Sequence, residues 1–297
     1  MSTPPPEWVR VGSSEISAQI DPLGAQLSVL EDSAGNDLLW EGNPTIWAGR
    51  APILFPIVGA LAGGQYRLKS EVRTLSRHGF ARGSAFSVVH ADGRSAVFKL
   101  TADESTRRAY PFEFELAVRF AVEGATLFVT TLIRNLGTGP MPASQGYHPA
   151  FRWPLPYGQV RSAHFIEFAR QESAHIRRLD AQGLVTPTLH PSPIVGTRLS
   201  LVDALFECDA VIFDEIRSRS VSYGAESGPR IEVGFPDAPY LGIWTKPSAP
   251  FICIEPWHGI ADPQGFTGDF RDKPGIFTLA AGAQREITMS ISLRGAC

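Results

Sequence analysis

The chain has 297 residues, of which 43% are hydrophobic and 19% are charged, proportions that indicate a folded globular protein rather than a disordered one. Its 27 Lys and Arg and 30 Asp and Glu give a net charge of −3 at pH 7, which offers no basic surface to attract a polyanion. We therefore expect no nucleic acid partner. No stretch approaches the roughly 18 apolar residues of a membrane helix, so we also expect no membrane partner.

The cysteines indicate a reducing compartment. Cys208, Cys253 and Cys297 are an odd number and form no C-x-x-C pair, a poor basis for a disulfide framework or a thiolate zinc site. The first residues, MSTPPPEWVRVGSSEI, have no basic segment followed by an apolar one. We expect a cytoplasmic protein with a loose tail over residues 1–7.

Two hairpins are predicted in the first half of the chain. Asp92-Gly93 separates an apolar run at 86–89 from another at 96–100. Residues 112–120 alternate apolar side chains at even positions with mostly charged ones at odd positions, which predicts a half-buried strand. Glu123-Gly124 separates this strand from the next, at 127–133.

The rest of the chain gives the same type of signal. Residues 287–293 alternate apolar and polar side chains and predict a further strand near the C-terminus. No segment keeps apolar residues at helical spacing for about 10 to 12 residues, and 24 Pro and 28 Gly interrupt the whole chain. We predict an all-β fold, a large antiparallel β-sandwich with few short helices, and, because no linker-like tract divides it, a single domain over 1–297.

The common cofactor motifs are missing. The sequence has no phosphate loop, dinucleotide turn, nucleophile elbow or H-E-x-x-H zinc helix. Gly59, Gly63 and Gly64 form a cluster that we interpret as a turn and not as a phosphate cradle. We expect no cofactor and no metal.

Three segments place ionisable groups among aromatic, Pro and Gly residues: RHGFAR at 77–82, GYHPAF at 146–151 and IEPWHG at 254–259. Glu255 ends a largely apolar strand, and burial raises the pKa of a carboxyl toward that of a useful base. Each group also has a structural interpretation. Glu255 alone is as compatible with an acid held by backbone donors or an arginine, and His78 or His148 alone with a hydrogen-bonded loop histidine.

The remaining histidines receive no functional role at this stage. They lie in polar or turn-like contexts, and we expect them on the surface: His90, His164, His175 and His190.

Together with RAPILFPIVG at 50–59, these segments resemble the aldose 1-epimerase (galactose mutarotase) family, in particular its shorter, bacterial, LacX-like branch. The order and spacing of the motifs match over roughly residues 10–295. The resemblance implies a galactose mutarotase-like supersandwich with a sugar cleft, a small-molecule sugar as partner, and neither metal nor nucleotide. It implies an enzyme that interconverts the α and β anomers of a hexose-like sugar.

The resemblance also assigns roles to residues of this chain. Glu255 is expected to be the base, and His148 the acid, with His78 as the second histidine of the site. The resemblance gives Arg50 and Asp209 as sugar-binding residues. Aromatic residues near the motifs are candidates for an apolar platform under the sugar ring, with core packing, the commoner fate of an aromatic residue, as the alternative: Trp257, Phe80 and Tyr147.

The sequence departs from the better-characterised galactose mutarotases, because His78 is not in an L-H-G-G setting and Glu255 is followed by Pro-Trp. The resemblance therefore does not specify galactose. Arg77 and Arg82 flank His78, and a forked cation suits a phosphate, so a hexose 6-phosphate is an alternative substrate. A structural ion pair is the alternative role for Arg82.

Two further alternatives stay open from sequence. The chain is compatible with a carbohydrate-binding protein that has kept the fold without turnover, since fold does not imply function. It is also compatible with a metalloenzyme in which His78, His148 and Glu255 form a facial triad. A monomer and a homodimer are both compatible with the sequence.

Overall fold

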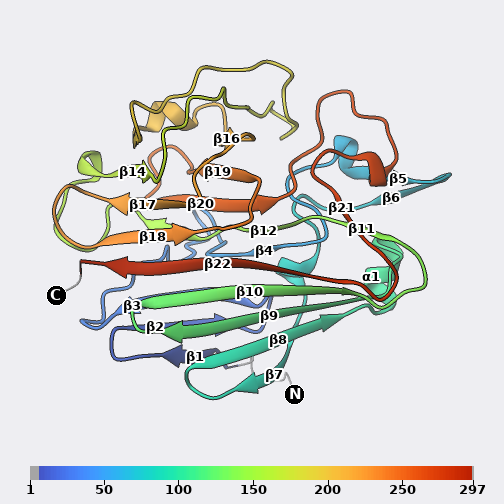
Figure 1. Ribbon diagram of the computed structural model, residues 1–297, viewed down its shortest axis with the longest axis horizontal. Coiled ribbons are helices and arrows are strands. Elements are labelled where there is room, and N and C mark those ends of the chain that lie inside the picture. The colour runs from blue at the N-terminus through green and yellow to red at the C-terminus, as the bar shows by residue number, and fades with distance from the viewer. Residues whose placement is uncertain (1–6, 296–297) are drawn as a thin grey trace.

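The computed structural model describes residues 7–295, and all the strand pairs within its sheets are antiparallel. The largest sheet has nine strands. In spatial order they are β15 (Arg198–Ser200), β14 (Phe165–Phe168), β17 (Ser220–Gly224), β18 (Arg230–Gly234), β22 (Gln284–Arg294), β10 (Thr126–Asn135), β9 (Phe114–Glu123), β8 (Ser95–Thr101) and β7 (Ser87–Ala91). Figure 1 shows the long strands β22, β10, β9 and β8 side by side.

A second sheet has six strands and positions the candidate site. Its order is β16 (Val211–Phe213), β19 (Tyr240–Trp244), β20 (Phe251–His258), β12 (Gln145–Tyr147) and β4 (Ile53–Leu54), with β13 (Ala150–Arg152) also paired to β20. Smaller sheets are formed by β1 (Val9–Gly12), β2 (Ile16–Asp21) and β3 (Gln26–Asp32), by β5 (Gln65–Leu68) and β6 (Glu71–Thr74), and by β11 (Met141–Ala143) and β21 (Phe277–Leu279).

Helices are few and short, as predicted. Within residues 7–295 the α-helix is α1 (Glu104–Ala109), and the 3-10 turns are η1 (Ala62–Gly64), η2 (Ala81–Gly83), η3 (Arg161–Ala163), η4 (Asp203–Phe206) and η5 (Phe270–Asp272). None of these helices has the length and apolar character needed to cross a bilayer. The fold class, a large antiparallel β-sandwich, is confirmed. The tail expected over 1–7 lies, except for Glu7, outside the described residues.

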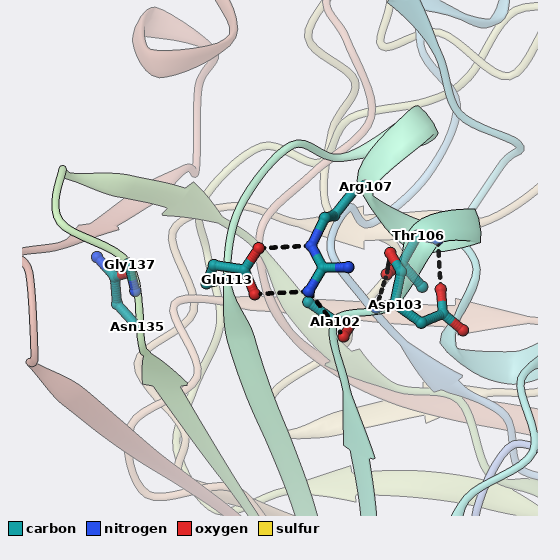
Figure 2. Close-up of polar contacts among 7 residues, drawn as sticks. All are labelled: Ala102, Asp103, Thr106, Arg107, Glu113, Asn135 and Gly137. Atoms are coloured by element: carbon teal, nitrogen blue, oxygen red, sulfur yellow. Dashed lines mark hydrogen bonds and ion pairs between the residues drawn. The ribbon is translucent and has the colours of Figure 1, made fainter.

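Helix α1 connects β8 to β9 at one end of the nine-stranded sheet (Figure 1). It begins with a capping box: Asp103 accepts a hydrogen bond from the Thr106 N–H at 2.7 Å, and the Asp103 N–H donates to Thr106 Oγ1 at 2.8 Å. The Arg107 Nη2 atom donates to Glu113 Oε2 at 2.9 Å, as Figure 2 shows. These contacts fix the connection between β8 and β9.

The predicted hairpins are present. β9 and β10 pair from Glu123 opposite Thr126 onward, and β7 pairs with β8 across the Asp92-Gly93 turn. The even-numbered residues of β9 from Phe114 to Phe120 are buried, because period-two alternation places them on the core face of the sheet.

The two larger sheets share a core, and Tyr147 connects them. Its hydroxyl donates to the Ile287 carbonyl on β22 at 2.7 Å and accepts from the Thr131 N–H on β10 at 3.2 Å. Tyr147 therefore belongs to the interior of the sandwich. Of the two roles considered for Tyr147, the structure shows core packing and not a platform for the sugar, because successive residues of an extended chain point to opposite sides and His148 takes the side of the cavity.

Strand β20 is buried on both faces. Ile252 and Ile254 pack into the main core, whereas Cys253 and Trp257 belong to two smaller apolar clusters on the other side of the sheet. Glu255 has the parity of Cys253 and Trp257, so it faces away from the sandwich core. In Figure 1 the yellow segment near residue 190 lies above β16 and β19, on this outer side.

One of the histidines expected on the surface is buried. His164 is only 2% exposed. Its burial is tolerated because both ring nitrogens have partners. Nε2 accepts a hydrogen bond from the Leu155 N–H at 3.1 Å, and Nδ1 lies 3.0 Å from the Val160 carbonyl oxygen. Burial lowers the pKa of His164. A polar loop sequence did not reveal this, because imidazole can satisfy both nitrogens inside a loop.

Candidate active site

A cavity of about 130 Å³, part of which is open to solvent, lies on the outer face of the six-stranded sheet. Predicted residues line it together with residues that the sequence did not single out: Trp47, Val58, Gly59, Arg77, His78, Arg82, His148, Leu179, Asp209, Ala210, Ile212, Trp244, Glu255, Trp257 and Ala261.

Glu255 lies at the centre of this sheet and is 1% exposed. It is opposite Gly242 on β19, and a Cβ atom added to Gly242 would lie 2.4 Å from the Trp257 ring. Only a residue without a side chain leaves room there for the Trp257 indole. The Gly242 position thus allows Trp257 to form one wall of the cavity beside the Glu255 carboxyl group.

His148 follows β12 and lies against Glu255. Its Nε2 atom is 3.1 Å from Glu255 Oε2, and His148 is 7% exposed. The Trp47 ring stacks on the imidazole, with centroids 5.2 Å apart and planes at 27°, and the edge of Trp244 packs at 5.8 Å. These two indoles fix the orientation of the His148 ring.

The polar atoms of this group lack protein partners. Glu255 Oε2, His148 Nδ1 and Trp257 Nε1 are buried side-chain atoms without a hydrogen bond of ordinary geometry. The 3.1 Å approach between His148 and Glu255 is close, but its alignment does not make a hydrogen bond. Buried polar atoms are nearly always satisfied in native proteins, so unpartnered ones in a cavity indicate a place for a polar ligand or water.

Burial sets the protonation of the pair. It raises the pKa of Glu255 well above its usual value, an effect that the Asp209 carboxylate increases and that Arg77 and Trp257 oppose. Burial likewise lowers the pKa of His148 to about 3. Both shifts have the same cause, because a low-dielectric environment disfavours the charged form of each group. Strongly shifted groups in a cavity are candidates for catalysis.

His78 is held by the glycine turn that the sequence indicated. The ring Nδ1 atom of His78 accepts a hydrogen bond from the Gly59 N–H at 3.1 Å, and the backbone N–H of His78 donates to the Gly59 carbonyl at 2.9 Å. Burial, with smaller contributions from His148, Arg77 and Arg82, lowers the pKa of His78 well below its usual value. The ring is therefore neutral, with its proton on Nε2, and it is a hydrogen-bond donor to the cavity.

The backbone of His78 is strained. Its φ of +67° lies in the left-handed region, which non-glycine residues rarely occupy and which costs of order 1–3 kcal/mol. Asp209 has a similar φ of +61°. Strain of this type often occurs at functional sites, where the surrounding structure holds a side chain in the orientation that it needs.

A buried ion pair behind the cavity fixes the same turn, and the sequence reasoning missed it. Lys273 Nζ is 3.1 Å from Asp262 Oδ1, and both side chains are almost fully buried. Asp262 Oδ2 accepts from the Ala62 N–H at 2.9 Å, and the Asp262 N–H donates to the Ala60 carbonyl at 2.9 Å. Asp262 thus anchors residues 60–62, which follow Gly59, the partner of His78.

The open side of the cavity carries charge. Arg77 Nη2 is 3.5 Å from Asp209 Oδ2, an ion pair that is partly exposed. Arg82 also lines the cavity, and no described residue gives it a hydrogen bond or an ion pair. The structural ion pair that we considered for Arg82 is therefore absent from residues 7–295.

Arg50 is not part of this cavity. Its Nη1 atom donates to the Ser28 carbonyl at 2.7 Å, and its guanidinium lies 5.3 Å from the centroid of the Trp8 ring. These contacts engage Arg50 outside the cavity, on β3 and the segment before β1, so the structure does not bring it to the other predicted residues. Phe80 also lies outside and packs its ring against Phe55.

The metal-binding triad considered from sequence is not assembled. Within the described residues, the side chains whose ligand atoms cluster at metal-binding distance are those of His148, Cys253 and Glu255, all within 4.8 Å of one another. His78 does not belong to this group. Its Nδ1 atom is already occupied by the Gly59 N–H.

The match to known families agrees with the motifs. A family model for aldose 1-epimerase matches residues 8–267. This range contains the histidine and glutamate motifs together with all the strands that carry them. The chain therefore belongs to the aldose 1-epimerase family, and the resemblance predicted from its motifs is confirmed.

Within this family the chain is similar to LacX. It is 31% identical over 278 residues to the plasmid-encoded protein LacX of Lactococcus lactis subsp. lactis, which covers 90% of this chain and 93% of that protein. Among solved structures, it resembles a galactose mutarotase related enzyme from Lactobacillus acidophilus, at 29% identity and a TM-score of 0.90 over 97% of both chains. A galactose mutarotase-like protein from Lactobacillus casei ATCC 334 aligns with a TM-score of 0.91 at 29% identity, over 97% of this chain and 100% of that one.

Proposed function

We propose that this protein is an aldose 1-epimerase that interconverts the α and β anomers of a hexose-like sugar by acid and base catalysis. The observation that carries the proposal is the buried His148–Glu255 pair, with unpartnered polar atoms in a cavity that opens to solvent. Anomer exchange needs one group to take the proton from the C1 hydroxyl and another to protonate the ring oxygen as the C1–O5 bond opens. The open aldehyde then rotates about C1–C2 and recloses by the reverse transfers.

Between the lowered pKa of His148 and the raised pKa of Glu255, the pair holds one exchangeable proton. With that proton on His148, the pair is a carboxylate and an imidazolium, the base and the acid that the reaction needs. After ring opening the proton count on each group is inverted. On reclosure Glu255 returns its proton to the C1 oxygen and His148 takes the proton from O5, which restores the starting state. Each positioned transfer contributes about 10² to 10⁴-fold.

Other cavity residues orient the sugar. His78 offers an Nε2–H donor to a sugar oxygen, since Gly59 occupies its other nitrogen. Asp209 accepts from a sugar hydroxyl at the open side, where Arg77 holds it. Trp257, Trp47 and Trp244 supply apolar faces for the C–H side of the ring.

A phosphorylated sugar is the second candidate substrate, and Arg82 is the observation that favours it. Its guanidinium lines the cavity without a partner among residues 7–295, and it lies near Arg77, whose charge lowers the Arg82 pKa in addition to burial. Two neighbouring cations suit a dianion. Replacing Arg82 with Ala is expected to lower acceleration of a 6-phosphorylated hexose by about 10- to 100-fold. Arg119→Ala, on the exposed side of β9, is the matched control.

The test of activity uses freshly dissolved single anomers of several aldoses, with and without a 6-phosphate, followed by NMR against the spontaneous rate. Acceleration of at least one sugar supports the proposal. Binding of sugars without any acceleration favours a non-catalytic carbohydrate-binding protein instead. We also propose that residues 1–297 act as one domain, because the main hydrophobic core draws on residues from Val11 to Leu293.

We further propose a reducing, cytoplasmic location. Cys208 is exposed and Cys253 is buried, and both are unpaired thiols within the described residues. Exposed free thiols persist in compartments where glutathione and thioredoxin keep them reduced.

A further inference from the structure

The proposed reaction does not use Cys253, although it lies directly beside the reacting pair. Cys253 is two residues before Glu255 on β20, so both side chains project from the same face of the sheet. Its thiol is fully buried and does not line the sugar cavity. One ligand atom each from His148, Cys253 and Glu255 lie within 4.8 Å of one another.

We propose that His148, Cys253 and Glu255 form a binding site for a zinc-like divalent ion, whose fourth coordination position faces the sugar cavity. A thiolate, an imidazole and a carboxylate are all common zinc ligands, and three protein ligands with one open position are typical of accessible zinc sites. Thiolate and carboxylate together balance the charge of a divalent ion, which removes the main penalty of burying it.

The geometry is close to what such an ion requires. With bonds of about 2.0 to 2.3 Å, tetrahedral zinc brings its ligand atoms to about 3.3 to 3.6 Å from one another. His148 Nε2 and Glu255 Oε2 are already 3.1 Å apart. The widest of the three separations, at most 4.8 Å, must shorten by about 1 Å.

Two features of the site favour entry of an ion. Glu255 Oε2 has no hydrogen bond to break, since it is buried without a partner. His148 and Glu255 line the cavity, which connects the site to solvent. Binding exchanges protons for the ion: the Cys253 thiol proton, and the proton shared by His148 and Glu255, leave to solvent.

The consequence for activity rests on the proposed function. An ion bound here occupies both the acid and the base, so the metal-bound protein is an inactive state of the epimerase. Zinc would then act as an inhibitor that binds below the sugar and not as a cofactor.

The test uses Co²⁺ as a spectroscopic probe, because a cobalt–thiolate bond gives a charge-transfer band that carboxylate and imidazole alone do not give. The background variant is Cys208→Ser/Cys297→Ser, which leaves Cys253 as its single thiol. We expect one equivalent of Co²⁺ to produce the band, and zinc to abolish it by competition. Adding Cys253→Ser, or Cys253→Ala where serine impairs folding, is expected to remove the band.

Absence of a stoichiometric band in the background variant, or its persistence after Cys253 is replaced, would overturn the proposed metal site. These readouts need no sugar, so they are independent of whether the protein is an epimerase. On a sugar whose anomer exchange the protein accelerates, one equivalent of zinc is expected to inhibit the background variant. The Cys253→Ser variant should keep most of its own metal-free rate at the same zinc concentration. Equal inhibition of both variants would show that zinc acts elsewhere.

Discussion

The Nε2 atom of His148 lies 3.1 Å from Oε2 of Glu255, yet the two atoms do not have the alignment of a hydrogen bond. The two groups are therefore close enough to exchange a proton, but no hydrogen bond joins them. Trp47 stacks on the imidazole and restrains it in this position. Burial of both partners disfavours their charged forms, so the proposed reaction begins with a carboxyl group and an imidazole that share one proton.

Loss of the proposed acid should be specific to one histidine. His148→Ala is expected to reduce the catalysed exchange rate by about 10² to 10⁴-fold, the usual contribution of a positioned proton transfer. His175→Ala, at an exposed position, is the control and should change the rate little. Exchange NMR with a single sugar measures both variants. Equal rates for His148→Ala and the parent would remove His148 from the mechanism.

The pH profile should follow the proton count of the pair. The proposed mechanism requires one proton on His148 and Glu255 together. A second proton is added as the pH falls through the lowered His148 pKa of about 3, and the shared proton is lost as the pH rises through the raised Glu255 pKa. We expect a plateau with an acid limb near pH 3 and an alkaline limb well above 4.5. Initial rates corrected for the uncatalysed reaction at each pH provide the profile. A rate that rises with an ordinary carboxylate pKa near 4.5 would contradict the burial argument.

The Asp262–Lys273 pair should matter for stability. Asp262→Asn leaves the buried Lys273 ammonium without its counter-charge and is expected to cost about 3 to 5 kcal/mol of unfolding free energy. Asp262→Asn/Lys273→Met removes both charges and should recover part of this loss. Urea denaturation measures each variant. If the single and double variants are equally unstable, an unpaired charge is not the cause.

Gly242 should tolerate no side chain. Gly242→Ala places a methyl group 2.4 Å from the Trp257 ring, and the overpacking is expected to cost about 1 to 3 kcal/mol. Displacement of Trp257 should also slow anomer exchange, because this ring forms the wall beside Glu255. Gly139→Ala has no atom within 4 Å of the added methyl and serves as the control. Thermal unfolding and exchange rates that match between the two variants would show that Trp257 accommodates the methyl group.

Sequence reasoning predicted the strands that alternate clearly. Residues 112–120 and 287–293 have one buried and one solvent face, so their pattern has a period of two and both lie in the nine-stranded sheet. Short strands could not be recognised from the sequence in the same way. β4 and β12 have 2 and 3 residues and are entirely buried, which leaves no alternation to read.

The site residues brought together are those inside recognisable motifs, such as His78 and Glu255. Trp47 and Trp244 reach the cavity from a loop and from β19, and nothing in their local sequence distinguishes them from core aromatics. Arg50 is adjacent to a motif but does not line the cavity, because adjacency in sequence does not fix where a long side chain points. Which side chains reach the cavity depends on how the strands pair, and a single sequence does not show which strands pair.

The proposed mechanism depends most directly on Glu255 as the base. Glu255→Gln keeps the shape of the side chain but cannot take the C1 hydroxyl proton. We predict that, on a sugar that the parent accelerates, catalysed exchange measured by NMR falls by about 10² to 10⁴-fold or more, while sugar affinity measured by calorimetry stays within about 10-fold. A Glu255→Gln variant that folds, binds the sugar and exchanges its anomers at close to the parental rate would contradict the account.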